Sequence, residues 1–154
     1  MLPNDEIKER TKRAVELFKQ GYNCSQSVVM AYADLYDIDI NTVAKLATSF
    51  GGGMGRLREV CGAVSGMFMV FGLEYPFIDT KNKASKNENY KKVQETATEF
   101  KTAMGSIICA DLLSQKREAQ HYESADRTKE YYATRPCAQC VAIAAEITGK
   151  NITK

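Results

Sequence analysis

The sequence predicts an all-α fold, a single-domain bundle of about five to six helices over residues 1–154. Apolar residues recur every three or four positions along most of the chain, which is the period of an amphipathic helix. No stretch alternates apolar and polar residues over the length of a strand, and no internal repeat is present. A chain of 154 residues can bury a sizeable core as one domain, so it needs no disulfide for stability.

The N-terminal segment contains the signals for two helices. The apolar spacing predicts a first helix over residues 4–20, with Asn4 as its cap. A second helix is expected after Asn23, because Asn23 and Gln26 have the spacing of a capping box. Its apolar face continues to Leu35, so we expect the helix to extend that far.

A glycine run separates the next two predicted helices. Asn41 is the expected cap of a short third helix that ends at Ala47. Residues 50–55 are dense in glycine and are predicted to form a loop. The apolar positions that follow predict a largely buried fourth helix over residues 57–72, with Cys61 on its apolar face.

The second half of the chain contains a long helix and a terminal helix. Residues 79–86 are polar and are expected to form an exposed connection. A helix over residues 87–113 follows, with Cys109 beside its inward-facing positions. Residues 114–134 are polar and have no clear period, so no element is predicted there. A helix over residues 136–148 closes the chain.

Composition excludes several classes of function. The net charge is +2, and 26% of residues are charged with both signs, so the sequence has no basic stripe for nucleic acid. The acidic first residues lack the basic-then-apolar order of a signal peptide. The longest apolar run, around residues 67–73, is far shorter than the roughly 20 residues of a membrane-spanning helix. We therefore expect a cytoplasmic protein without a membrane span.

Five cysteines are the most informative residues of the chain, at Cys24, Cys61, Cys109, Cys137 and Cys140. Thiols in a reducing compartment normally stay reduced, and an odd number cannot pair completely within one chain. Because stability does not require them, the cysteines are interpreted as groups for redox chemistry or for binding a metal.

Cys137 and Cys140 form a C-x-x-C pair at a predicted helix start. Pro136 at the first helical position would place the pair in the first turn, where free N–H groups and the helix dipole stabilise a thiolate. This predicts Cys137 as an attacking thiol, with Cys140 or Cys61 as the resolving thiol. Alternatively, Cys140 shares helical spacing with Ala144 and is a core residue.

The residues before Cys61 suggest how a sulfur site could be tuned. Glycines in residues 51–55 would let the backbone pass close to the site, or offer N–H groups to a cluster or anion. Arg56 and Arg58 could lower the pKa of Cys61 by electrostatic attraction, although a solvated arginine face is the alternative.

The spacing of the cysteines resembles that of a known family. Cys24 is followed by the motif Cys61-Gly62-Ala63-Val64-Ser65-Gly66 and then by Cys109 and Cys137. This order resembles the family of redox-active proteins named for its C_GCAxxG_C_C pattern, over nearly the whole chain. The resemblance implies that these four cysteines are the functional groups, and it implies no particular substrate or reaction. Cys140 lies outside the pattern.

Three functions follow from these observations. The first is electron transfer by an iron–sulfur cluster or other metal on Cys24, Cys61, Cys109 and Cys137; zinc fits less well, because its structural sites usually contain paired C-x-x-C ligands. The second is a thiol–disulfide oxidoreductase that uses Cys137 without a cofactor. The third is a non-catalytic helical interaction protein with buried cysteines.

Both redox hypotheses predict that the cysteines meet in space. At least three of the four family cysteines are expected beside residues 51–55, with Cys140 at the periphery. The expected partner is a redox protein or a small-molecule oxidant or reductant. Whether the protein is an enzyme, and whether it forms a homodimer, stays open.

Overall fold

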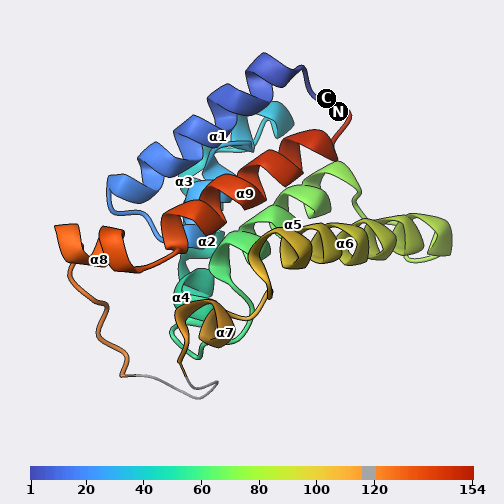
Figure 1. The fold of residues 1–154 in the computed structure, drawn as a ribbon. Coiled ribbons are helices and arrows are strands. Elements are labelled where there is room, and N and C mark those ends of the chain that lie inside the picture. The colour runs from blue at the N-terminus through green and yellow to red at the C-terminus, as the bar shows by residue number, and fades with distance from the viewer. Residues whose placement is uncertain (116–120) are drawn as a thin grey trace.

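The computed structural model describes residues 1–115 and 121–154, and it confirms the all-α fold (Figure 1). The described residues form one domain with six helices of at least seven residues and several shorter helical segments. In chain order the elements are α1 (Asn4–Lys19), α2 (Cys24–Met30), η1 (Ala33–Tyr36), α3 (Ile40–Ala47), η2 (Thr48–Phe50), α4 (Gly51–Met54), α5 (Gly62–Glu74), α6 (Lys83–Met104), α7 (Cys109–Leu113), α8 (Lys129–Thr134) and α9 (Cys137–Lys150).

The terminal helix α9 lies at the centre of the bundle. It packs along α1 on one side and against α2 and α5 on the other, and α6 covers the outer side of α5 and α9 (Figure 1). The short elements α4, α7 and α8 gather near the end of the bundle at which α9 begins. The first turns of α2, α5 and α9 therefore lie close to these short elements.

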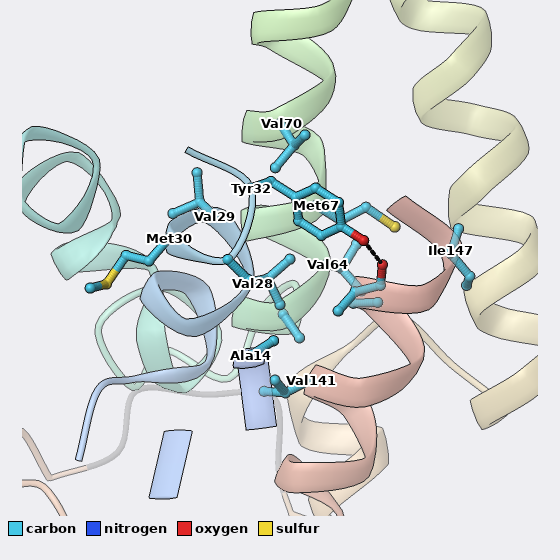
Figure 2. Packing of buried hydrophobic residues seen from close by; sticks show 14 of the residues in the cluster. Ala14, Val28, Val29, Met30, Tyr32, Val64, Met67, Val70, Val141 and Ile147 are labelled. Atoms are coloured by element: carbon cyan, nitrogen blue, oxygen red, sulfur yellow. Dashed lines mark hydrogen bonds between the residues drawn. The ribbon is translucent and has the colours of Figure 1, made fainter. Parts of the chain in front are cut away.

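The core lies between α1, α2, α5 and α9 (Figure 2). Val28, Val64 and Val141 are fully buried and come from three different helices. The hydroxyl of Tyr32 donates a hydrogen bond to the carbonyl of Ala145 at 2.6 Å, which joins the segment after α2 to α9 inside this core. Paired in this way, the tyrosine hydroxyl can be buried without a large desolvation cost.

The predicted start of the second helix is confirmed. The side chain of Asn23 accepts a hydrogen bond from the Gln26 N–H at 2.9 Å, and the Gln26 side chain accepts one from the Asn23 N–H at 3.1 Å. The helix ends at Met30, before the predicted Leu35, because the chain tightens into the 3₁₀ turn η1. Cys24 is consequently fixed as the first residue of a capped helix.

Two other predicted caps are wrong. Asn4 is the first residue of α1, and Pro3 precedes it without a capping side chain. The third helix is capped by Asp39, which accepts a hydrogen bond from the Thr42 N–H at 2.9 Å, whereas Asn41 lies within the helix. Asp39 and Asn41 are two residues apart, and a carboxylate and an amide are comparable caps. The sequence alone therefore did not show which of them caps the helix.

The predicted fourth helix begins later than its apolar spacing indicated. The backbone has positive φ at Met54 (68°), Arg56 (67°) and Arg58 (61°), which a right-handed helix does not allow. Leu57, expected on the buried face, is 47% exposed. The helix starts at Gly62, so Cys61 is its cap residue and does not belong to an internal stripe.

The long helix is displaced toward the N-terminus relative to the predicted range of 87–113. The Asn82 side chain caps it by accepting from the Ser85 N–H at 3.1 Å, and Gly105 ends it with a φ of 95°. Cys109 therefore begins a separate short helix, α7. Part of the predicted connection at residues 79–86 is helical.

The C-terminal region contains an additional element. In the segment without a prediction, Thr128 caps the short helix α8, while residues 116–120 lie outside the described part of the chain. The last helix begins at Cys137 with Pro136 as its cap residue, one position later than expected. Among the described residues, no helix combines the length and the apolar composition needed to cross a membrane.

Candidate functional site

All five cysteines line one cavity of about 70 Å³. The cavity lies where α2, α5, α7 and α9 begin, and Gly52 of the glycine run forms part of its wall. The structure thus brings together sulfurs from Cys24, Cys61, Cys109, Cys137 and Cys140, although long segments of sequence separate most of them. Three of these residues are buried, while Cys24 and Cys137 are half-buried.

The four cysteines of the family pattern occupy equivalent positions on their elements. Cys24 is the first residue of α2, Cys109 is the first residue of α7, and Cys137 is the first residue of α9. Cys61 is the cap residue of α5. Cys140 differs, because it lies one turn inside α9 on the buried side.

A short antiparallel contact fixes two of these cysteines. Val60 and Ile108 form an isolated β-bridge. The Cys61 N–H donates to the Ile107 carbonyl at 2.8 Å, and the Cys109 N–H donates to the Glu59 carbonyl at 2.6 Å. Backbone hydrogen bonds therefore hold Cys61 and Cys109 side by side. A bridge of one residue pair has no alternating pattern, so it could not be predicted from the sequence.

Glycines allow the backbone to approach the sulfurs closely, as the sequence predicted. Gly52 and Gly53 have left-handed φ values of 70° and 72°, so α4 is a distorted turn in the run predicted as a loop. A Cβ atom at Gly53 would lie 2.6 Å from the Cβ of Cys109, and one at Gly62 would overlap the sulfur of Cys24. A residue with a side chain at either position would therefore clash with its neighbours in the site.

Burial raises the pKa of Cys24 and Cys137 to about 12, and the neighbouring sulfurs add to the increase. The predicted low-pKa thiolate at Cys137 is therefore wrong. The start of α9 favours a thiolate, but the loss of water around the sulfur opposes it more strongly. In this state Cys24 and Cys137 are protonated at neutral pH.

Cys61 and Cys140 are neighbours inside the cavity. The hydrogen bond with Cys140 raises the pKa of the Cys61 thiol well above its ordinary value, and burial raises it further. Cys140, expected at the periphery, thus contacts a family cysteine within the site. All five cysteines are free thiols.

A buried arginine lies against the cysteines. Arg58 is 2% exposed, and its Nη1 atom lies 3.7 Å from the sulfur of Cys109. Burial raises the pKa of Cys109, and the Arg58 guanidinium opposes that increase. From the sequence, Arg58 could either act on Cys61 or belong to a solvated arginine face, whereas the structure buries it beside Cys109. Among residues 1–115 and 121–154, no group accepts a hydrogen bond from the buried Nε atom of Arg58.

Two further arginines at the cavity were missed by sequence reasoning. Arg127 and Arg135 line its wall together with Tyr131. Both arginines come from the polar segment or its end, where no periodicity predicts which side chains turn inward. Arg127 donates hydrogen bonds to the carbonyls of Phe18 at 2.9 Å and Tyr22 at 3.0 Å, which holds the segment against α1. Only the folded chain shows this contact.

The sulfurs do not form a mononuclear metal site as they stand. In the described part of the chain, no group of three or more His, Cys, Asp or Glu side chains has a geometry that could hold a metal ion. A zinc site requires four donors within about 2.0–2.3 Å of a single ion. The cysteine positions therefore assign neither zinc nor another single metal ion to the site.

Comparison with known proteins gives one match. Residues 22–151 match the model of the family described as "Putative redox-active protein (C_GCAxxG_C_C)". The matched region includes all five cysteines and every element from α2 to α9. Neither the curated proteins nor the solved structures contain a significant match to the chain.

Proposed function

Because the chain belongs to the C_GCAxxG_C_C family of redox-active proteins, we propose that it is an electron-transfer protein whose Cys24, Cys61, Cys109 and Cys137 hold an iron–sulfur cluster. One observation carries this proposal. Four elements each direct a cysteine at their first or cap residue to one cavity. Four buried structural cysteines would have no reason to share that placement.

The electrostatics of the cavity suit an anionic centre. The longer helices α5 and α9 direct their positive ends toward it, and Arg58 adds a buried positive charge. The N–H groups of Gly52 and Ser25 act to lower the pKa of Cys24. Those of Val64 and Ala63 do the same for Cys61. These groups would donate hydrogen bonds to ligating sulfurs and stabilise their negative charge.

The donor set also fits an iron–sulfur cluster. Such clusters are commonly held by four cysteine thiolates, and the family pattern supplies four. A cluster would contain more than one iron, so the four thiolates would not all have to bind a single ion as they do at a zinc site. When bound, the cluster would supply one-electron transfer. The protein's cysteines would bind it after losing their protons, and the bundle would exclude water.

The position of the site suits exchange of electrons with a partner. Cys24 and Cys137 are half-buried, so one edge of the site lies near the surface while Cys61 and Cys109 form its inner wall. A redox protein or a small-molecule oxidant or reductant could approach that edge. We propose such a partner as the source or acceptor of the electron.

Anaerobic reconstitution tests the proposal. The protein is incubated with iron and sulfide under reducing conditions, desalted, and assayed for both elements and for thiolate-to-iron absorption. Cys24→Ser, Cys61→Ser, Cys109→Ser and Cys137→Ser should each lose most of the bound iron and change the absorption spectrum. Cys140→Ser should retain both and is the matched control.

Two outcomes would contradict the proposal. If the wild-type protein takes up no stoichiometric iron and sulfide, the proposal that it binds a cluster is contradicted. Equal iron binding in all five variants would show that the metal binds elsewhere. A cysteine-free variant that also keeps every redox response of the wild type would favour the non-catalytic alternative.

A second candidate is a dithiol centre, which the contact between Cys61 and Cys140 favours. Oxidation would form one S–S bond between them, and two electrons and two protons would pass to a small-molecule disulfide that becomes two thiols. This differs from the predicted use of Cys137 as the nucleophile. Mass spectrometry of protein equilibrated with oxidised glutathione should then find a single Cys61–Cys140 disulfide, and random pairing would exclude the candidate.

A further inference from the structure

A second concavity, of about 240 Å³, opens beside the cysteine cavity, and the two share Arg58 and Gly52 in their walls. We call it the arginine groove. Arg56, Arg58, Arg127 and Arg135 all line it, and the described residues that line it include no Asp or Glu. Since the whole chain has a net charge of only +2, this collection of cations is a local feature.

The four guanidinium groups have no ion-pair partner in the described part of the chain. Among residues 1–115 and 121–154, none of them forms an ion pair. Arg127 is held by backbone carbonyls, and the guanidinium of Arg135 lies 4.7 Å above the ring of Tyr131. These neutral contacts orient the cations without neutralising them.

Two of the arginines also have buried donors for which the described residues provide no acceptor. The Nε atoms of Arg56 and Arg58 are buried and lack a hydrogen-bond acceptor among the described residues. Arg58 is itself only 2% exposed. A buried unsatisfied donor on a cation costs free energy, and the cost disappears when an anion binds. Repulsion among the arginines adds to this cost. Burial lowers the pKa of Arg56, and the positive charges of Arg58 and Arg135 lower it further.

We propose that the arginine groove binds a small molecule with a phosphate, sulfate or carboxylate group, and so holds an anionic ligand next to the cysteines. Guanidinium groups pair with such oxyanions through two parallel hydrogen bonds. The ligand is small because Arg58 lies too deep for a flat protein or nucleic-acid surface to contact. The volume of about 240 Å³ lies below the about 300–1,000 Å³ of pockets for drug-sized ligands, which suits a ligand smaller than these.

This proposal does not depend on the iron–sulfur cluster. The groove would bind the anion whether the neighbouring sulfurs hold a cluster, form a disulfide or stay as thiols. It adds a ligand-binding role to electron transfer and identifies the charge of the molecule that approaches the cysteines. The two proposals can therefore fail separately.

Calorimetric titration tests binding directly. Inorganic phosphate, sulfate and succinate are titrated into metal-free reduced protein at constant ionic strength, with chloride as the balancing anion. At least one of the three should bind, and Arg56→Gln and Arg135→Gln should each weaken that binding at least tenfold. Arg13→Gln is the matched control, because Arg13 is an exposed arginine on α1 that does not line the groove. Arg56→Lys, which keeps the charge, should lose less affinity than Arg56→Gln.

Paired alkylating agents provide a second readout that reports on the groove itself. Iodoacetate is anionic and iodoacetamide is neutral, while both transfer a similar group to sulfur. For Cys24 and Cys137, the rate ratio of iodoacetate to iodoacetamide should exceed the ratio measured in the unfolded protein. Arg56→Gln and Arg135→Gln should reduce that ratio at least threefold, and saturating phosphate should reduce it in the wild type.

The proposal is overturned if none of the three anions binds more tightly than chloride. It is also overturned if Arg13→Gln weakens binding as much as the groove variants do. An iodoacetate ratio equal to that of the unfolded protein would show that the groove does not attract anions. Circular dichroism confirms that each variant is folded before these comparisons are made.

Discussion

Gly62 lies so close to Cys24 that a Cβ atom at position 62 would overlap the Cys24 sulfur. The same Cβ atom would lie 2.8 Å from the carbonyl oxygen of Phe50, so it could not move away toward the glycine run. The sulfur of Cys24 therefore leaves no room for a side chain at Gly62, the first glycine of the family motif. The motif and the distant cysteine are parts of one site.

Gly62→Ala should displace Cys24 and destabilise the protein by about 1–3 kcal/mol, the usual cost of overpacking a core. Gly72→Ala is the control on the same helix, because a Cβ atom there meets no atom of the described residues within 4 Å. That change should raise the free energy of unfolding by up to about 1 kcal/mol, since alanine favours a helix. Urea unfolding measures both, and equal effects would show that the contact with Cys24 is unimportant.

Asn23→Ala should lower the free energy of unfolding by about 1–2 kcal/mol. It removes the cap of α2 and the hydrogen bond from the Asn23 side chain to the Thr48 carbonyl at 2.9 Å. Asn23→Asp keeps the cap but cannot donate to Thr48, so its loss should be smaller. Asn41→Ala is the control and should change stability by less than about 0.5 kcal/mol, because Asn41 caps no helix. A larger loss for Asn41→Ala in urea unfolding would contradict this assignment.

The thiols should make stability fall at high pH. Burial raises the folded-state pKa of Cys24 and Cys137 from an unfolded value near 9 to about 12. Between these values the folded state binds more protons than the unfolded state, so the free energy of unfolding decreases as pH increases. Their contribution is complete below about pH 9 and is lost as pH rises toward 12. Unfolding of metal-free protein at several pH values measures the slope.

Cys24→Ala should make that slope shallower, because one of the shifted groups is gone. Iodoacetamide should alkylate Cys24 and Cys137 much more slowly in the folded protein than in guanidinium at pH 8. Equal rates in the two states would mean that neither thiol has a raised pKa.

Arg58→Met should separate stability from reactivity. Burying a charge costs free energy, so replacing Arg58 by an apolar side chain of similar length should leave the free energy of unfolding unchanged or raise it. The same change removes the cation that opposes the raised pKa of Cys109, so alkylation of Cys109 should become slower. Arg58→Lys keeps the charge and should preserve more of that reactivity. If Arg58→Met unfolds the protein and Arg58→Lys does not, the arginine has a structural role.

The sequence predicted the helices more reliably than their ends. Helical periodicity identified α1, α2, α3, α5, α6 and α9, because each buries an apolar face in the core. It placed the starts of α5 and α6 wrongly. Periodicity records which residues are apolar, whereas the start of α5 depends on backbone turns at Arg56 and Arg58. The end of α6 depends on Gly105 in a left-handed conformation, which the apolar pattern does not reveal.

The cysteines could be predicted as one group, but their environment could not. Resemblance and spacing selected Cys24, Cys61, Cys109 and Cys137, and the structure places all four at one cavity. The raised pKa of Cys137 was missed because a helix start favours the thiolate, and burial is not visible in a local motif. The arginine groove was missed for a similar reason. Its members come from segments far apart in the chain that only tertiary contacts bring together.

The placement of the cysteines at the starts of separate elements has a consequence for how the protein would acquire a ligand. No single segment of the chain contains the site, because the four family thiols lie at the starts of four different helices, α2, α5, α7 and α9. The conformational entropy of gathering the donors is therefore lost during folding, before any ligand arrives. A ligand that binds all four would bind only the native state, so its free energy of binding would add to the free energy of unfolding. Cellular supply of that ligand would then set the lifetime of the folded protein as well as its redox capacity.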